Sequence, residues 1–428
     1  MPFLTLEDPN AKIKGSRDPL GAQPIWSHFA RHFVTNVTGS ANSVRGFTLL
    51  LLGRYFADRL VSSGDAQTED TLDIALRMEQ IGAYARHVGH GVDADIRGIE
   101  RVKVLLQEHQ GRPFIETGPR GRILSDQRVN GLWGLYTVSA RASGLLPEGP
   151  TGVTTASADL IERAYRPILE PVESQLLKIL ASGGRIQTSK KDPLFRSLCR
   201  LLPETLSQEE SLFYAHHLRD ARETDGAGRR GRQANFVDLL GAHTDLDVAL
   251  TRAEAISLRE GATATDPSLA RALSRTIHLE SCLAPADALF DHVLARGGNT
   301  PEEIDAELKE RWGPTVPNLD SSAFGELLPE IESVASKPRT EKILRCQNAL
   351  AAGQYADAVR ALLDWNEDLM KSRKAAPWAR LSPDGRVEVR YRGTESRLPT
   401  GDEIATLWKN QYYVDSLKRI TRQVANTA

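Results

Sequence analysis

The chain has 428 residues, of which 40% are hydrophobic and 26% are charged. These values predict roughly two to four compact domains and exclude a disordered chain. The 54 basic and 56 acidic residues give a formal net charge of -2. The totals therefore exclude a strongly basic protein, and contact with nucleic acid requires a local basic patch.

Three cysteines, Cys199, Cys282 and Cys346, are far apart and form no Cys-x-x-Cys pair. We expect them to be free thiols in a reducing compartment. The first residues, MPFLTLEDPNAKIKG, lack a basic stretch followed by an apolar one, so we expect no secretory signal. The most apolar run, GFTLLLLGRYFADRL, is interrupted by Arg54 and is shorter than the roughly 20 residues that span a bilayer. We expect a cytoplasmic protein with no membrane partner.

Apolar residues predict a series of helices in the first part of the chain. Residues 1–24 carry Pro and Gly at short intervals, which indicates an irregular arm. Beyond the arm, apolar residues recur every three or four positions, as on one face of a helix. The expected helices cover residues 25–37, 47–60, 68–89 and 95–110.

A further helix is expected over residues 126–142, with an apolar side formed by Val129, Leu132, Trp133, Tyr136 and Ala140. Ser143-Gly144 ends it. The next segment, LLPEGPTGVTT, is short and rich in Gly and Pro, which favours a small hairpin or wing. A new helix then begins, with Thr155 or Ser157 as its N-cap.

This order of elements resembles a winged-helix module that extends from Ile96 to Tyr165. RVNGLWGLYTVSARASGLL is similar to a recognition helix that leads into a strand, and GVTTASADLIERAY is similar to the return into the last helix. Ala156-Ser157 stand where the family usually has Gly. The resemblance implies contacts with double-stranded DNA, and three readings stay open: DNA contact, protein docking and a scaffold. The residues it places on the recognition helix or beside its entrance are Arg128, Asn130, Thr137, Arg141, Arg112, Arg120 and Arg122.

The rest of the chain is expected to be helical over residues 190–340, followed by a helical hairpin that turns at AAGQY. Asp384-Gly385 in PWARLSPDGRVEVRYRG predicts a β-hairpin. A last helix with Thr400 as its cap and exposed aromatic residues is expected to follow. The predicted fold is mainly α and multi-domain, with an embedded winged-helix-like unit and a small C-terminal β-hairpin. The predicted domains are 1–95, 96–170, 171–340 and 341–428.

The sequence has no phosphate-binding loop of the form GxxxxGK[ST]. The segment DGAGRRGRQ is a basic loop between helices, with Arg229, Arg230 and Arg232 available either to solvent or to the phosphates of nucleic acid. Asp220, Glu223 and Asp225 interrupt its positive charge.

Two groups of histidines and acids are candidates for a metal site or for catalysis. ARHVGHGVDAD contains His87 and His90, and YAHHLRD contains His216, His217 and Asp220; His243 stands alone. The alternative is that these histidines lie at helix ends and interact with the helix dipole. We expect no metal and no cofactor.

No nucleophile elbow or complete kinase motif set is present. The first hypothesis is therefore a non-enzymatic DNA-binding or scaffold subunit of a bacterial multi-protein complex. In general character the chain also resembles helical accessory proteins of bacterial anti-phage defence systems, which implies partner proteins encoded beside it. The second hypothesis is an enzyme with an unrecognised helical active site built from the histidine groups. The third is a homo-oligomeric structural protein that docks through Trp408, Tyr412 and Tyr413.

Overall fold

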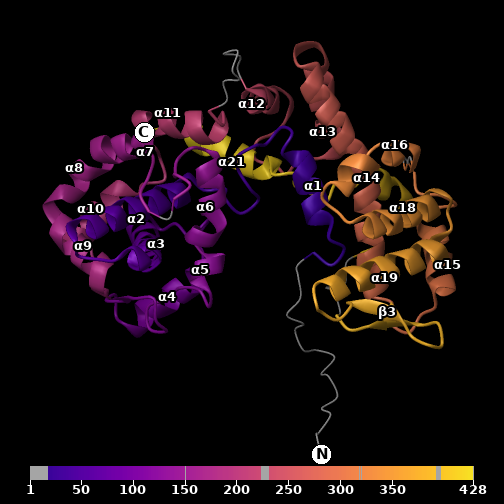
Figure 1. Cartoon of the computed structure of the whole chain (residues 1–428), viewed down its shortest axis with the longest axis horizontal. Coiled ribbons are helices and arrows are strands. Elements are labelled where there is room, and N and C mark those ends of the chain that lie inside the picture. Colours follow the sequence, from indigo (N-terminus) through magenta and orange to yellow (C-terminus); the bar gives the residue numbers. More distant parts are fainter. Residues whose placement is uncertain are drawn as a thin grey trace, which may run out of the picture. The chain divides into compact units, whose positions relative to one another are not determined.

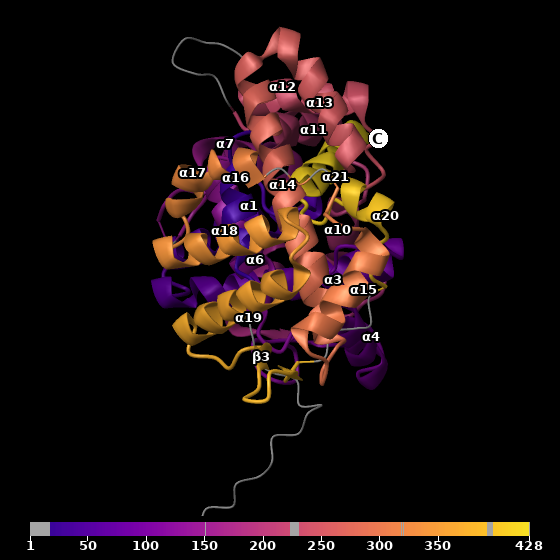
Figure 2. The same cartoon turned by 90° about the vertical axis from the view of Figure 1, so that its right-hand side faces the viewer.

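The computed structural model describes residues 18–149, 151–222, 231–317, 319, 321–391 and 397–427 (Figures 1 and 2). The chain divides into two compact units. The first unit combines Met1–His32 with Ala249–Tyr412, and the second combines Phe33–Val248 with Tyr413–Ala428. These boundaries differ from the expected ones near residues 95, 170 and 340, and the division into four smaller domains stays a prediction.

The second unit contains most of the helices of the N-terminal half and the last helix of the chain. Its helices are α2 (Val44–Ser63), α3 (Thr71–His90), α4 (Ile99–Glu108), α5 (Gln127–Asn130), α6 (Leu132–Ala142), α7 (Thr155–Leu160), α8 (Arg166–Leu169), α9 (Glu173–Ser182), α10 (Pro193–Leu201), α11 (Gln208–Tyr214), α12 (Arg232–His243) and α21 (Val414–Ala425). Single turns of 3-10 or π-helix occupy Thr68–Asp70, Ile161–Tyr165, Glu170–Val172 and Ala215–Arg219. Its two strands are β1 (Phe114–Ile115) and β2 (Gly184–Arg185).

The first unit begins with α1 and continues with the helices that follow residue 249. Its helices are α1 (Ala22–Ala30), α13 (Arg252–Thr265), α14 (Pro267–Leu294), α15 (Pro301–Trp312), α16 (Ser321–Gly325), α17 (Leu328–Glu332), α18 (Lys337–Ala351), α19 (Tyr355–Ser372) and α20 (Gly401–Thr406). Its strands are β3 (Ala379–Leu381) and β4 (Val387–Val389).

The expected fold class is confirmed: in the described residues the chain is mainly helical, with two small two-stranded antiparallel sheets. The β-hairpin predicted near the C-terminus is β3–β4, which packs beside α19 (Figure 2). Gly385 takes the positive φ of 78° that its turn requires. No helix among the described residues is long and apolar enough to cross a membrane.

Helices α2 and α3 form the centre of the second unit and lie side by side (Figure 1). Both are buried on most sides, as expected for helices whose apolar residues are not confined to one face. Two glycines let them approach closely. A Cβ on Gly82 would lie 2.2 Å from the Leu49 side chain, and one on Gly53 would lie 3.0 Å from the Ala75 backbone. A larger residue at position 82 would therefore push the helices apart.

A buried ion pair also lies in this core. Arg45 on α2 is 2% exposed and binds Glu210 at the start of α11. Its remaining N–H groups donate to the carbonyl oxygens of Pro203 at 2.6 Å and Thr205 at 2.9 Å. Tyr165 donates to the same carboxylate at 2.8 Å. A buried guanidinium is costly unless it is paired and hydrogen-bonded, and here it is both.

The first expected helix ends earlier than its apolar pattern suggests. The helix expected over residues 25–37 is α1, which stops at Ala30. Beyond the helix, the buried Asn36 anchors the chain, because its side-chain amide donates to Ser143 Oγ and to the carbonyl oxygens of His217 and Leu218, at 2.8–3.1 Å. The arm expected over residues 1–24 lies mostly outside the described residues.

The prediction of a single helix over residues 126–142 is wrong. It is two helices, α5 and α6, which are separated at Gly131. Glu79 on α3 causes the break, because one of its carboxylate oxygens accepts a hydrogen bond at 2.9 Å from the backbone N–H of Leu132, the first residue of α6. Val129, expected on the apolar side, is 56% exposed. A buried carboxylate thus caps the helix that the sequence presented as a recognition helix.

The expected wing is a loop in the part that the structure describes, with no strand in residues 145–149 or 151–154. Leu145 and Leu146 are buried instead of forming a strand edge. Thr154 closes the loop by donating to the carbonyl oxygens of Gly144 and Leu145 at 3.0 and 3.2 Å. The N-cap of α7 is Thr154, not Thr155 or Ser157. The wider resemblance to a winged-helix module stays a prediction.

The last helix is also two helices. Thr400 caps α20 as expected, with Glu403 completing a capping box. The chain then leaves the helix because the Glu280 carboxylate accepts hydrogen bonds from the backbone N–H of Lys409 and Asn410 and from Tyr412 Oη, at 2.5–3.0 Å. Tyr412 and Tyr413 are buried, so they do not form the exposed docking face that the third hypothesis requires.

The substitution Glu79→Gln tests the cap on α6, because it should change how the free energy of unfolding depends on pH. Burial raises the pKa of Glu79 from 4.5 to about 7, against the hydrogen bonds from Gln127 and Leu132. The folded state therefore holds the proton more tightly than the unfolded state, and the resulting stability is lost as the pH rises through 7. Between about pH 5 and pH 8 we expect this group to lower the free energy of unfolding by roughly 2–3 kcal/mol. The decrease should disappear in Glu79→Gln.

Urea unfolding of the full chain at both pH values measures this difference, with hydrogen exchange of α6 peptides reporting on the second unit. The control is Glu170→Gln, which removes an exposed carboxylate. An unchanged pH dependence in Glu79→Gln would contradict the role of Glu79.

Candidate nucleic-acid interface

Strands β1 and β2 bring together two segments that are about 70 residues apart in the sequence. They pair antiparallel, with Phe114 opposite Arg185. Two further backbone hydrogen bonds extend the pairing, from Ile186 N–H to Pro113 at 3.3 Å and from Thr188 N–H to Gly111 at 2.9 Å. Residues 111–115 and 184–188 therefore run side by side.

This pairing gathers basic side chains on the surface of the second unit. All of them are exposed, and they lie on the paired segments or within a few residues of them. We call them the β1–β2 basic surface: Arg112, Arg120, Arg122, Arg185, Lys190 and Lys191. The sequence pattern identified the first three. The other three were missed because only the pairing of β2 with β1 places them beside the first segment.

An aromatic ring lies between the two segments. The guanidinium carbon of Arg185 lies 3.9 Å from the centroid of the Phe114 ring, and that of Arg120 lies 4.5 Å from it. These distances fit cation–π contacts. The ring thus holds two guanidinium groups near each other, although their like charges repel.

The carboxylates beside this surface already form ion pairs or hydrogen bonds with other groups of the protein. Glu116 binds Arg120 at 2.8 Å, Asp73 accepts a hydrogen bond from Thr117 at 3.2 Å, and Asp192 caps α10. Among the described residues, no carboxylate pairs with the other five members of the surface, Arg112, Arg122, Arg185, Lys190 and Lys191. Their charges are available to an anionic ligand.

Gln80 on α3 fixes the course of the chain directly after β1. Its side-chain Nε2 donates to the carbonyl oxygen of Glu116 at 2.9 Å, and its Oε1 accepts from the Glu116 N–H at 3.1 Å. Gly121 then passes so close to Glu116 that a Cβ there would lie 2.7 Å from the Glu116 backbone. This tight turn brings Arg120 and Arg122 back to β1.

The residues expected on the recognition helix have different surroundings. Arg128 and Asn130, on α5, are exposed. Thr137 donates to the carbonyl oxygen of Trp133 at 2.6 Å. Arg141 donates to Pro147 and Gly149 carbonyl oxygens, both at 3.3 Å, and so holds the loop after α6. Of these four residues, Arg128 and Asn130 on α5 are therefore the two whose side chains are exposed and not bonded to the loop or helix beside them in the described part of the chain.

Of the three arginines of the expected basic loop, the structure describes only Arg232. Arg229 and Arg230 lie outside the described residues, and Arg232 is half-buried at the first position of α12.

The expected histidine groups do not form a site together. His87 Nδ1 lies 2.6 Å from Asp93 Oδ1, and His90 Nε2 lies 2.7 Å from the carbonyl oxygen of Cys199. Both are in the last turn of α3, as the helix-end interpretation predicts. His217 is 5% exposed, with Nδ1 2.9 Å from the carbonyl oxygen of Ser143. Among the described residues these groups do not come within metal-binding distance of one another.

His217 should stay neutral at mildly acidic pH. Burial lowers its pKa to about 4, against the hydrogen bond with the Ser143 carbonyl. Because the unfolded-state pKa is near 6.5, stability present above pH 6.5 is lost as the pH falls toward 4. We expect NMR to show His217 to remain mostly neutral between about pH 7 and pH 5, whereas in urea it should titrate near 6.5. A folded-state midpoint above about 6 would contradict its burial.

No protein-family model, no curated protein and no solved structure matches this chain. The argument for function therefore rests on the geometry of the surface.

Proposed function

We propose that this chain binds double-stranded DNA through the β1–β2 basic surface and acts as a non-enzymatic subunit of a larger complex. The observation that carries the proposal is the gathering of five exposed basic side chains, by strand pairing, at a place where the neighbouring carboxylates are already bonded. Such a local excess of positive charge suits the phosphates of nucleic acid, although the whole chain is nearly neutral.

The arrangement favours phosphate contacts over the reading of bases. Arg112, Arg122 and Arg185 lie beside a two-residue strand pair and a turn, which is too little structure to enter a groove. Binding by this surface is therefore expected to depend strongly on salt and weakly on DNA sequence. Arg128 and Asn130 on α5 are the exposed side chains that add sequence preference if α5 enters a groove. A role beside partner proteins, which the suspected resemblance to helical accessory proteins of anti-phage defence systems implies, stays a prediction.

A variant with four substitutions, Arg112→Ser, Arg185→Ser, Lys190→Ser and Lys191→Ser, tests the proposal. We expect it to bind a short labelled duplex at least about tenfold more weakly than the wild-type chain at low salt. The slope of log affinity against log salt should become shallower by about 0.9 for each phosphate that the variant no longer neutralises. Fluorescence anisotropy between about 50 and 200 mM salt measures both quantities.

The matched control removes four arginines whose side chains are 40–65% exposed but paired with carboxylates: Arg163→Ser, Arg166→Ser, Arg345→Ser and Arg360→Ser. Both variants have the same net charge. Equal weakening in the two variants, or binding that salt does not affect, would refute the proposal.

A further inference from the structure

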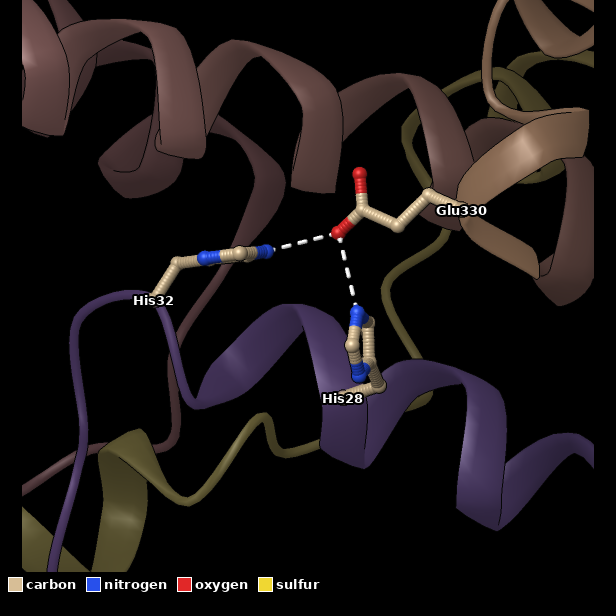
Figure 3. A group of neighbouring side chains, drawn as sticks. All are labelled: His28, His32 and Glu330. Carbon is tan, nitrogen blue, oxygen red and sulfur yellow. Dashed lines mark hydrogen bonds and ion pairs between the residues drawn. The ribbon is translucent and has the colours of Figure 1, made fainter. Parts of the chain in front are cut away.

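Two histidines and one carboxylate meet in the first unit, outside the proposed interface (Figure 3). His28 lies in the last turn of α1, and His32 follows four residues later, just beyond the end of the helix. Four-residue spacing places both rings on the same side of the chain, and their centroids are 5.6 Å apart. Glu330 on α17 points its carboxylate at both rings (Figure 3).

The geometry of these groups is close to that of a tetrahedral metal site. His28 Nε2 lies 3.3 Å from Glu330 Oε1, and His32 Nε2 lies 2.6 Å from the same oxygen. The three ligand atoms all lie within 4.8 Å of one another. Bonds of about 2.0–2.1 Å in a tetrahedral site place the ligand atoms about 3.3 Å apart. The distance from His28 Nε2 to Glu330 Oε1 already has this value. The distance from His32 Nε2 to the same oxygen reaches it when the His32 ring moves about 0.7 Å away.

We propose that His28, His32 and Glu330 bind a divalent transition-metal ion of the Zn²⁺ type. Two imidazole nitrogens and one carboxylate oxygen are a donor set for zinc, cobalt or nickel, whereas calcium and magnesium require oxygen ligands. The side chains of His28, His32 and Glu330 are 34%, 41% and 18% exposed, so an ion in solution reaches them. Three protein ligands leave the fourth position to an exchangeable water molecule.

Arg275 on α14 orients the carboxylate. It binds Glu330 Oε2, and its guanidinium carbon lies 5.9 Å from the centroid of the Phe29 ring. Because Arg275 occupies Oε2, only Oε1 is available to the metal, and Glu330 would be a monodentate ligand. The positive charge of Arg275 also opposes a second cation. We therefore expect an affinity below that of closed structural zinc sites, which have four protein ligands.

The ion would fasten α1 to α17. His32 and Glu330 are 298 positions apart in the sequence, so the site closes a long loop of the chain. An ion that binds only the folded state raises the stability of the first unit with its concentration. In the absence of metal, His32 Nε2 and Glu330 Oε1 are hydrogen-bonded at 2.6 Å, and the ion must replace this bond.

Zinc titration of the full, chelator-treated chain tests the site, by calorimetry at about pH 7.5 and by thermal unfolding with and without Zn²⁺. We expect one Zn²⁺ per chain and a higher unfolding temperature. His28→Gln and His32→Gln together should weaken binding by at least about tenfold, the smallest loss seen when even an orienting residue of a metal site is removed. The amide at position 32 can still donate a hydrogen bond to Glu330, so the link between α1 and α17 is retained.

The matched control is His216→Gln with His243→Gln, which removes two exposed histidines of the second unit. It should bind Zn²⁺ as the wild-type chain does. The proposal is overturned if the wild-type chain binds no Zn²⁺, or if the variant at positions 28 and 32 binds it as tightly as the control. DNA binding is measured separately, and neither result depends on the other.

Discussion

The candidate interface depends on two adjacent polar residues of the buried helix α3, Glu79 and Gln80. Both are less than 5% exposed, and buried polar groups must find hydrogen-bonding partners. Gln80 exchanges two hydrogen bonds with the backbone of Glu116 and so fixes the chain at the end of β1. Glu79 accepts from Gln127 and Leu132 and so fixes the junction of α5 and α6. The same turn of one helix thus positions the β1 segment and α5.

Arginines in the core and on the surface of the second unit differ in whether a carboxylate neutralises them. In the core, Arg45 and Glu210 neutralise each other, whereas no cation among the described residues is bonded to Glu79, and burial raises its pKa. On the surface, Arg112 and Arg185 lie near further cations, and neither pairs with a carboxylate in the part of the chain that the structure describes. Their mutual repulsion disfavours the folded state, and bound phosphates would relieve it. This difference separates the β1–β2 basic surface from the many exposed arginines that are paired with acids.

Local patterns predicted those features that depend on a few neighbouring residues. The turn at Asp384-Gly385 and the cap at Thr400 are confirmed, because each needs only its own short segment. The break at Gly131 was missed because its cause, Glu79, lies on another helix. Half of the basic surface was missed for the same reason, since Arg185 joins it only through strand pairing. The metal candidate had one local signal, the four-residue spacing of His28 and His32, but Glu330 is far away in the sequence.

Mapping the DNA contact directly tests the central claim most sharply. A duplex with photoreactive bases would be cross-linked to the full chain at low salt, and the attached peptides would be identified by mass spectrometry. We predict cross-links in residues 111–122 and 184–191, with α5 as the next most frequent position. Cross-links concentrated in Ala249–Tyr412, or none above those of an unrelated near-neutral protein, would contradict the account.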